Sequence, residues 1–364
     1  MPALIRPEEP QSIDLPSRKA QLAAETDVLV VGGGPSGLGA ALGATAAGCQ
    51  VILAERYGFL GGNATASLVM PLMSYHTQSP LVEKKTGDEP LTPVDTSLLP
   101  IDHGHGEPVV SGVLTTLLGR LVSAEGAISP SLRTGYVVPF DPEIFKLVAL
   151  DLLDEAGVQF LFHALATQVI GSGQIEGVVF ETKSGPIVIR AKSVIDCSGD
   201  GDIAALGGAP FEIGREEDGL VQPMTLMFRM VEFERAAFDA YLKKHPDQWY
   251  GVHGLWDLVR QATEKGELEL PREDVLFFGT PHAREVSVNC TRITKVFGTN
   301  VWDLSYAEWK SRHQMRQVAA FLRHYVPGFE KAYLVQSGTT IGVRESRRIT
   351  GEYQLNADDI ANAR

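Results

Sequence analysis

The sequence predicts an α/β fold, in which a parallel sheet with a β-meander is joined to a second domain of the α+β type. Three observations support this prediction. Residues 27–55 follow the order strand, glycine turn, helix and strand, which is typical of a parallel sheet. Residues 165–190 form short strand-like runs broken by Gly-Ser and Ser-Gly pairs, and residues 209–340 mix strand-like runs with helical ones.

The length and composition are those of a globular protein of about two domains, at roughly 150 residues per domain. The 364 residues are 44% hydrophobic and 21% charged. Lys and Arg number 32 and Asp and Glu 45, so the net charge is −13. Nucleic acids and anionic membranes bind basic surfaces, so neither is an expected partner. The sequence has no apolar run of 18 residues, so no transmembrane helix is expected.

The cysteines indicate a reducing compartment. Cys49, Cys197 and Cys290 are far apart and form neither a CxxC pair nor a zinc-binding pattern. We therefore expect free thiols in a cytoplasmic protein, with Cys197 and Cys290 as small core residues of apolar strands. Residues 1–24 are polar and lack a signal-peptide pattern, so we expect them to form an N-terminal arm.

The first chemical motif is a dinucleotide-binding unit. Residues 27–31, DVLVV, have the β-branched character of a buried strand, and GGGPSG at 32–37 follows at once and fits G-x-G-x-x-G. A helix of small residues at 38–47 and a second strand at 49–55 complete the unit. The glycine motif alone is weak, but this order of elements is the context that makes it specific. The unit predicts a Rossmann-like fold.

Each part of this unit has a physical role. Gly32 permits the tight turn, Gly34 lets the main chain approach a diphosphate, and Gly37 lets the helix pack against the sheet. The N-terminus of the helix offers N–H groups and a partial positive charge to the diphosphate. Glu55 ends the second strand, where a carboxylate can accept hydrogen bonds from ribose hydroxyls. This acid disfavours NADP, although Arg56 beside it weakens that inference.

The unit does not by itself separate FAD from NAD. Gly61 and Gly62 follow the ribose acid, where an NAD site needs no second glycine pair, and they suit a close approach of backbone to a larger cofactor. The SGDGD run at 198–202 is likewise not needed by NAD enzymes. These features favour FAD, and an NAD-dependent dehydrogenase remains an alternative.

Four blocks of the sequence resemble, in the same order, bacterial FAD-dependent oxidoreductases of the glutathione-reductase superfamily, near its fumarate-reductase and thiazole-synthase-like branches. The blocks are GGGPSGLGAALGA (32–44), ERYGFLGGNATASLV (55–69), VIDCSGDGDIAALGGAPFEIG (194–214) and IGVRESRRITGEYQL (341–355). The resemblance implies bound FAD and an oxidoreductase activity. Motif and resemblance together assign to the FAD site Gly32, Gly34, Pro35, Ser36, Gly37, Glu55, Arg56, Gly61, Gly62, Asn63, Ala64, Val169, Gly199 and Asp202.

Within this set the resemblance implies particular roles. Gly199 lets the backbone approach the diphosphate, and Val169 contacts the adenine through backbone groups. Asp202 is expected to contact the cofactor. Capping of a helix that starts near Ile203 is the alternative for both Asp200 and Asp202.

The resemblance also implies a division into domains. The meander is expected to be a small appendage, and a separate strand at 193–197 to return to the parallel sheet. The expected domains are an arm at 1–24, an FAD-binding domain at 25–208 with the meander at about 165–190 and a loop-rich insert at about 71–110, a substrate or cap domain at 209–340, and a return to the FAD domain at 341–364. Relatives continue with a glycine-rich helix that faces the flavin, so this last segment is expected to be incomplete.

Three residues are candidates for catalysis. Arg344 can hold a substrate carboxylate with its two-pronged guanidinium, and the resemblance favours it over Arg347 and Arg348. A surface salt-bridge cluster is the alternative for all three arginines. His76 can act as general acid or base, or be structural, and Arg292 can serve as a second anion anchor.

No metal site is expected. Residues 102–107, DHGHGE, have ligands at metal spacing, but they lie in a Pro- and Gly-rich stretch at 86–108 that is typical of a loop. The expected function is transfer of a hydride between a small polar or anionic substrate and flavin N5, in a possible homo-oligomer. A non-catalytic FAD-binding scaffold is the first alternative, because the resemblance leads us to expect the flavin-facing segment to be incomplete.

Overall fold

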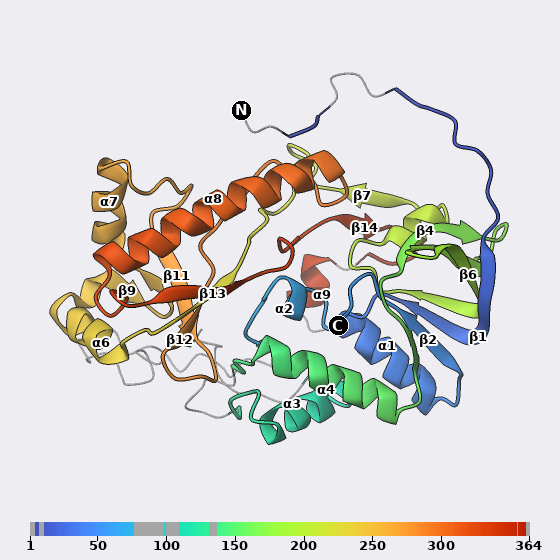
Figure 1. Cartoon of the computed structure of the whole chain (residues 1–364), viewed down its shortest axis with the longest axis horizontal. Coiled ribbons are helices and arrows are strands. Elements are labelled where there is room, and N and C mark those ends of the chain that lie inside the picture. The colour runs from blue at the N-terminus through green and yellow to red at the C-terminus, as the bar shows by residue number, and fades with distance from the viewer. Residues whose placement is uncertain are drawn as a thin grey trace.

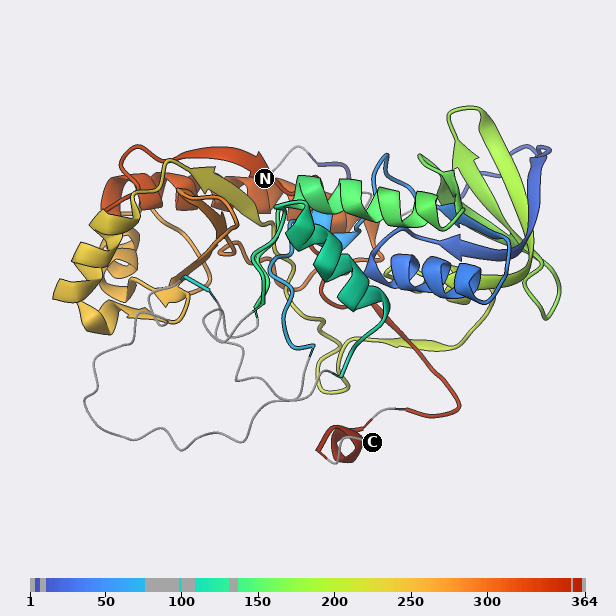
Figure 2. The same cartoon turned by 90° about the horizontal axis from the view of Figure 1, so that it is seen from below.

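The structure, a computed structural model, describes residues 4–6, 11–75, 98–99, 109–130, 137–354 and 356–361. In this part of the chain, two six-stranded sheets lie at opposite ends of the long axis of the molecule (Figures 1 and 2). The candidate base His76, the histidines of residues 102–107 and most of the expected insert at 71–110 lie outside the described residues.

The first sheet contains the predicted parallel strands. Its order is β3 (Gln159–Leu161), β2 (Val51–Ala54), β1 (Gln21–Val31), β6 (Gly185–Asp196), β5 (Gly177–Thr182) and β4 (Leu165–Ile170). The first four strands are parallel, whereas β5 is antiparallel to both of its neighbours, β6 and β4. The strand expected at 27–31 begins earlier, at Gln21, because the preceding residues pair with β6 from Ile187 onward.

The meander is not a small appendage, because β6 is a single strand of 12 residues. Its first part pairs with β5, up to Arg190, and its residues 187–196 pair with β1. We expected a separate strand at 193–197, but residues 187–196 contain no glycine or proline that would interrupt β6. The parallel strands and the meander therefore form one sheet.

Helices surround both sheets. They are α1 (Pro35–Ala46), α2 (Asn63–Ala66), α3 (Val113–Ser123), α4 (Pro142–Glu155), α5 (Asp202–Leu206), α6 (Arg235–Lys244), the 3-10 turn η2 (Pro246–Gln248), α7 (Trp256–Glu264), α8 (Val301–Tyr325) and α9 (Ala357–Ala361). Strand β1 is buried on both faces: Val28 and Val30 belong to the core under α1, α3 and α4, and Leu29 and Val31 to the core under α5. Burial on both faces explains the β-branched run. No helix in the described ranges is long and apolar enough to cross a membrane.

The second sheet is antiparallel, as predicted for residues 209–340. Its order is β13 (Tyr333–Ser337), β8 (Phe228–Val231), β12 (Glu285–Val288), β11 (Val275–Gly279), β10 (His253–Gly254) and β9 (Trp249–Tyr250). A separate pair joins β14 (Arg347–Ile349) to β7 (Phe211–Ile213). Strand β8 begins only at Phe228, because Met224 and Thr225 before it form isolated bridges.

The two faces of the second sheet differ in character. Alternate residues of a strand point to opposite faces, and Phe228 and Val288 lie in an aromatic core together with Phe321 of α8. Arg229 follows Phe228 on β8, and Ser287 precedes Val288 on β12. These two residues are paired in register and therefore point to the opposite face. That face lies toward α4, which runs between the two sheets (Figure 2).

Candidate functional site

The first cavity opens at the carboxyl ends of β1, β2 and β6, where the predicted glycine turn follows β1. It encloses about 250 Å³. Open α/β sheets bind their ligands at this edge. The predicted FAD-site residues that line it are Gly32, Gly34, Pro35, Ser36, Glu55, Arg56, Gly62, Asn63, Gly199 and Asp202. The structure therefore brings together predicted residues from three separate parts of the chain, at 32–36, 55–63 and 199–202.

The glycines at this cavity are required by close packing. A Cβ on Gly32, whose φ is +106°, would lie 2.1 Å from the carbonyl oxygen of Cys197, which directly follows β6. A Cβ on Gly37 would lie 1.9 Å from the carbonyl oxygen of Gly32. Gly62 has a φ of +50°, and its Cβ would lie 2.8 Å from the Cα of Gly34. No side chain fits at these positions, so the backbone itself forms the floor of the cavity.

The N-terminus of α1 faces this floor without a cap of its own. Its N-cap residue is Gly34, no side chain makes a capping hydrogen bond, and Pro35 follows. Ser36 lines the cavity. The first N–H groups of a helix have no partner within the helix, so an anion such as a diphosphate can accept hydrogen bonds from them.

Glu55 is buried and fixes the glycine turn. Its Oε2 accepts a hydrogen bond from the N–H of Gly33 at 2.6 Å, and its Oε1 accepts one from the N–H of Tyr57 at 2.9 Å. The sequence motif did not predict this bridging role. Each carboxylate oxygen can accept a second hydrogen bond, so the group can still bind ribose hydroxyls.

Other predicted FAD-site residues lie outside the lining of this cavity. Gly61 donates its N–H to the carbonyl of Gly33 at 2.8 Å, and Ala64 belongs to the core beneath α4. Val169 pairs with Val178 inside the meander. The cavity is lined instead by Ala164 and by the first two residues of β4, Leu165 and Ala166.

The aspartates of the SGDGD run do not cap α5, which corrects the alternative considered for them. Helix α5 has no side-chain cap at its N-cap position. The N–H of Asp202 donates to the Oγ of Ser198 at 3.0 Å, and the N–H of Ala204, also in the first turn of α5, donates to the Oδ2 of Asp196 at 2.9 Å. The carboxylate of Asp202 instead accepts a 2.7 Å hydrogen bond from Arg347. Burial raises the pKa of Asp200 at the cavity wall.

A second cavity, of about 270 Å³, contains three arginines and is called here the arginine cavity. It is lined by Pro223, Thr225, Arg272, Leu276, Asn289, Thr291, Arg292 and Arg344. The structure thus brings the candidate residues Arg344 and Arg292 together and adds Arg272, which sequence reasoning missed. Partial burial lowers the pKa of Arg344, and the charges of Arg292 and Arg272 lower it further. The neighbouring Arg347 and Arg348 bond to acids instead, as a salt-bridge cluster would.

The two cavities share one segment of backbone. Thr340, Ile341 and Val343 line the first cavity and Arg344 lines the second. The segment is held by Thr225, which exchanges two backbone hydrogen bonds with Gly342. The Nδ2 of Asn63 also donates to the carbonyl of Val343 at 3.4 Å. None of the side chains of residues 340–343 is charged, which explains why charge-based reasoning missed them.

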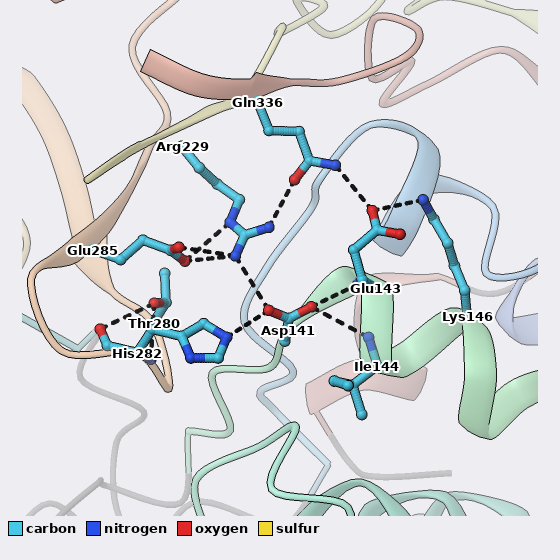
Figure 3. A network of polar contacts seen from close by, with 9 residues as sticks. All are labelled: Asp141, Glu143, Ile144, Lys146, Arg229, Thr280, His282, Glu285 and Gln336. Atoms are coloured by element: carbon cyan, nitrogen blue, oxygen red, sulfur yellow. Dashed lines mark hydrogen bonds and ion pairs between the residues drawn. The ribbon is translucent and has the colours of Figure 1, made fainter. Parts of the chain in front are cut away.

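A buried ionic network ties α4 to the second sheet (Figure 3). Arg229 donates to both oxygens of Glu285, at 2.8 and 2.9 Å, and to the Oδ2 of Asp141 at 3.2 Å. His282 contacts the same oxygen of Asp141 at 2.5 Å. Asp141 is also the N-cap of α4, because it accepts from the first N–H groups of that helix. The network therefore fixes the second sheet relative to the sheet that carries the first cavity.

The reactivity of Cys290 tests whether the core next to the arginine cavity is closed to solvent. It is fully buried, and its Sγ is hydrogen-bonded to the backbone of Leu276. Burial raises the pKa of its thiol to about 12. We expect iodoacetamide at pH 8 to leave Cys290 unmodified in the folded protein and to label it in urea, because the thiolate is the reactive form. Mass spectrometry of the peptides measures this, and equal labelling in both states would contradict the assignment.

The comparisons with known proteins place these features in a family. Residues 27–364 match the family described as FAD dependent oxidoreductase, and no curated protein matches. One similar solved structure is a geranylgeranyl bacteriochlorophyll reductase-like protein of Thermoplasma acidophilum, with 15% sequence identity and a TM-score of 0.45; the match covers 88% of this chain and 66% of that one. Another is p-nitrophenol 4-monooxygenase of Pseudomonas putida DLL-E4, with 14% identity and a TM-score of 0.47; the match covers 90% of this chain and 69% of that one. The flavin-dependent brominase Bmp2 is similar to the same degree, with 15% identity and a TM-score of 0.47; the match covers 89% of this chain and 68% of that one. The chain thus spans about two thirds of the length of each. Because the family match covers almost the whole chain, the protein belongs to the FAD dependent oxidoreductase family, and its cofactor is FAD.

Proposed function

We propose that the protein transfers a hydride between flavin N5 and a small polar or anionic organic substrate bound in the arginine cavity. The segment at 340–344 supports this most directly, because it lines both cavities. The segment leads from the first cavity to the second, so a cofactor that extends along it from the first cavity would reach a substrate bound beside Arg344. The free cysteines fit a reducing, cytoplasmic setting.

The residues of the first cavity fit FAD. The glycine floor leaves room for a diphosphate beside Ser36, at a helix N-terminus that no side chain caps. Glu55 would accept hydrogen bonds from ribose hydroxyls with its remaining lone pairs. Bound FAD would supply the two-electron chemistry at N5, and the chain would hold and orient the reactants.

In the arginine cavity, the guanidinium groups would orient the substrate. Arg344 and Arg292 form no ion pair with any acid of the described ranges, so both can bind a substrate carboxylate. A guanidinium can donate two parallel hydrogen bonds to a carboxylate and so fixes its orientation as well as its position. Holding a substrate beside the flavin in this way lowers the entropic part of the reaction barrier.

The visible spectrum of the purified full-length protein tests the proposal. We expect flavin absorbance after reconstitution with FAD, and bleaching of that absorbance when a substrate reduces the flavin. A protein that retains no flavin overturns the enzymatic proposal. A bound flavin that can be photoreduced but that no organic donor or acceptor reduces or oxidises would favour the scaffold alternative. Stabilisation in a thermal melt by NAD and not by FAD would favour an NAD-dependent dehydrogenase.

Substitution of Glu55 by glutamine tests its role in the first cavity. A glutamine has only one acceptor oxygen, so either the N–H of Gly33 or that of Tyr57 loses its partner. An unpaired buried N–H costs about 1–3 kcal/mol, so we expect FAD to bind roughly tenfold more weakly or worse. Titration with FAD followed by flavin fluorescence measures this. Glu176→Gln, at an exposed position, is the control, and equal FAD affinity in both variants would refute the role.

A further inference from the structure

The arginine cavity has more positive charge than its own acids compensate. Arg272 donates from Nε to Asp274 at 2.8 Å, and Asp274 is also bonded to His253. Arg292 and Arg344 have no acidic partner among the residues described here. Three guanidinium groups and one carboxylate leave two positive charges uncompensated, in a protein whose net charge is −13.

The arginines are held in place by contacts that leave their donors available. The backbone of Arg292 is fixed by Gln314, which accepts from its N–H at 2.9 Å and donates to its carbonyl at 3.2 Å. Within the described part of the chain, the guanidinium of Arg344 makes one long hydrogen bond, of 3.5 Å, to the Oγ1 of Thr225. Thr291 both accepts from and donates to the backbone of Leu226, so its hydroxyl is already used. The two uncompensated guanidinium groups are therefore the main free donors of the cavity.

The size of the cavity limits what it can hold. Its volume of about 270 Å³ lies below the roughly 300–1,000 Å³ of pockets that bury drug-sized ligands. Arg344 follows the shared segment and Arg292 follows the end of β12, so the two charges come from different elements. Two anchors from separate elements can bind two separate anionic groups of one small molecule.

We propose that the arginine cavity binds a small organic dianion, with one anionic group at Arg344 and the other at Arg292. The charge of the ligand follows from the cavity alone. That this dianion is the substrate rests on the proposed function, in which the flavin reaches the arginine cavity at residues 340–344. Arg272 is already paired with Asp274, so we assign it to positioning the ligand and not to neutralising one of the ligand's charges.

Thermal melts of the full-length, FAD-loaded protein test this at constant ionic strength. Malonate and succinate serve as dianionic probes, inorganic phosphate as a dianion without carboxylates, and acetate and malonamide as monoanionic and neutral controls. We expect dianions to raise Tm in a saturable way, and acetate and malonamide to leave it unchanged. A larger shift with phosphate than with the dicarboxylates would assign the site to a phosphorylated ligand. Equal shifts with acetate and malonate would overturn the proposal.

Variants locate the binding. We expect Arg292→Gln to weaken dianion binding at least tenfold, and Arg344→Lys to weaken it too, because lysine keeps the charge but loses the two-pronged geometry. Arg316→Gln is the matched control, since it removes the same charge from an exposed position on α8. Equal affinity in Arg292→Gln and in the control would overturn the proposal.

The flavin spectrum separates failure of this inference from failure of the proposed function. If the protein binds no FAD and dianions still raise Tm, the proposed function fails and the anion site remains. If FAD binds and no dianion changes either Tm or the flavin difference spectrum, the anion site fails and the FAD site remains. A dianion that binds and perturbs the flavin spectrum supports both.

Discussion

Replacement of Gly37 by alanine is expected to abolish FAD binding and to destabilise the protein by about 3 kcal/mol. Gly37 lies in the first turn of α1, and an added Cβ would lie 1.9 Å from the carbonyl oxygen of Gly32. That oxygen is backbone and cannot rotate away. Helix α1 would have to move from the sheet, and its N-terminus would leave the edge of the first cavity. Urea unfolding and titration with FAD measure the two effects.

Gly43 in the same helix is the matched control. No atom lies within 4 Å of the Cβ that an alanine would place there. Alanine is a better helix former than glycine by about 1 kcal/mol, so we expect Gly43→Ala to stabilise the protein slightly and to leave FAD affinity unchanged. If Gly37→Ala binds FAD as tightly as Gly43→Ala does, close packing at Gly37 is not needed for the site.

The β-α-β unit could be predicted from the sequence because its signals are local. A β-branched run, a glycine turn and a helix of small residues each act over a few residues, and the structure places β1, α1 and β2 where they were expected. The bounds differ where pairing with a distant strand decides them. Strand β1 gains its first residues, and β6 its continuity, from contacts between residues far apart in the chain.

The parts of the site that were not predicted are backbone and apolar groups brought in by tertiary packing. Ala164–Ala166 line the first cavity because β4 lies at the edge of the first sheet, whereas Val169 lies further along that strand. Residues 340–343 carry no charge, so no chemical pattern marks them. Arg272 was missed because it joins Arg292 and Arg344 only through tertiary packing, and no local pattern marks it. Asp141 before Pro142 is a recognisable helix cap, but its contacts with the second sheet are long-range.

Replacement of Arg229 by methionine is expected to destabilise the protein by about 3–5 kcal/mol, because it leaves buried carboxylates without their counter-charge. Arg229 and its partners Asp141 and Glu285 are each less than one tenth exposed. In Figure 3 the guanidinium lies between these two carboxylates and also donates to Gln336. Methionine fills a similar volume but can replace none of these hydrogen bonds.

Arg235→Met is the control for Arg229→Met. Arg235 pairs with Asp239 at 2.7 Å on the partly exposed surface of α6. Surface pairs of this kind contribute about 0–1 kcal/mol. Urea unfolding measures both variants, and Arg229→Lys shows whether the charge alone or the two-pronged geometry is needed. Similar losses in Arg229→Met and Arg235→Met would show that the buried network contributes nothing beyond a surface pair.

The pH dependence distinguishes loss of charge from loss of packing. Burial tends to raise the pKa of Asp141, but the hydrogen bond from His282 and the charge of Arg229 outweigh it, so the pKa is lowered. A lowered pKa stabilises the fold above the unfolded value near 3.9, and this contribution is lost as the pH falls through the folded pKa. Without the charge of Arg229, less opposes the tendency of burial to raise the pKa of Asp141, so that pKa rises. Glu285 also loses its only ion pair within the described ranges. We therefore expect the deficit of Arg229→Met relative to wild type to be larger at pH 7 than at pH 4, whereas a deficit caused by packing alone would be the same at both.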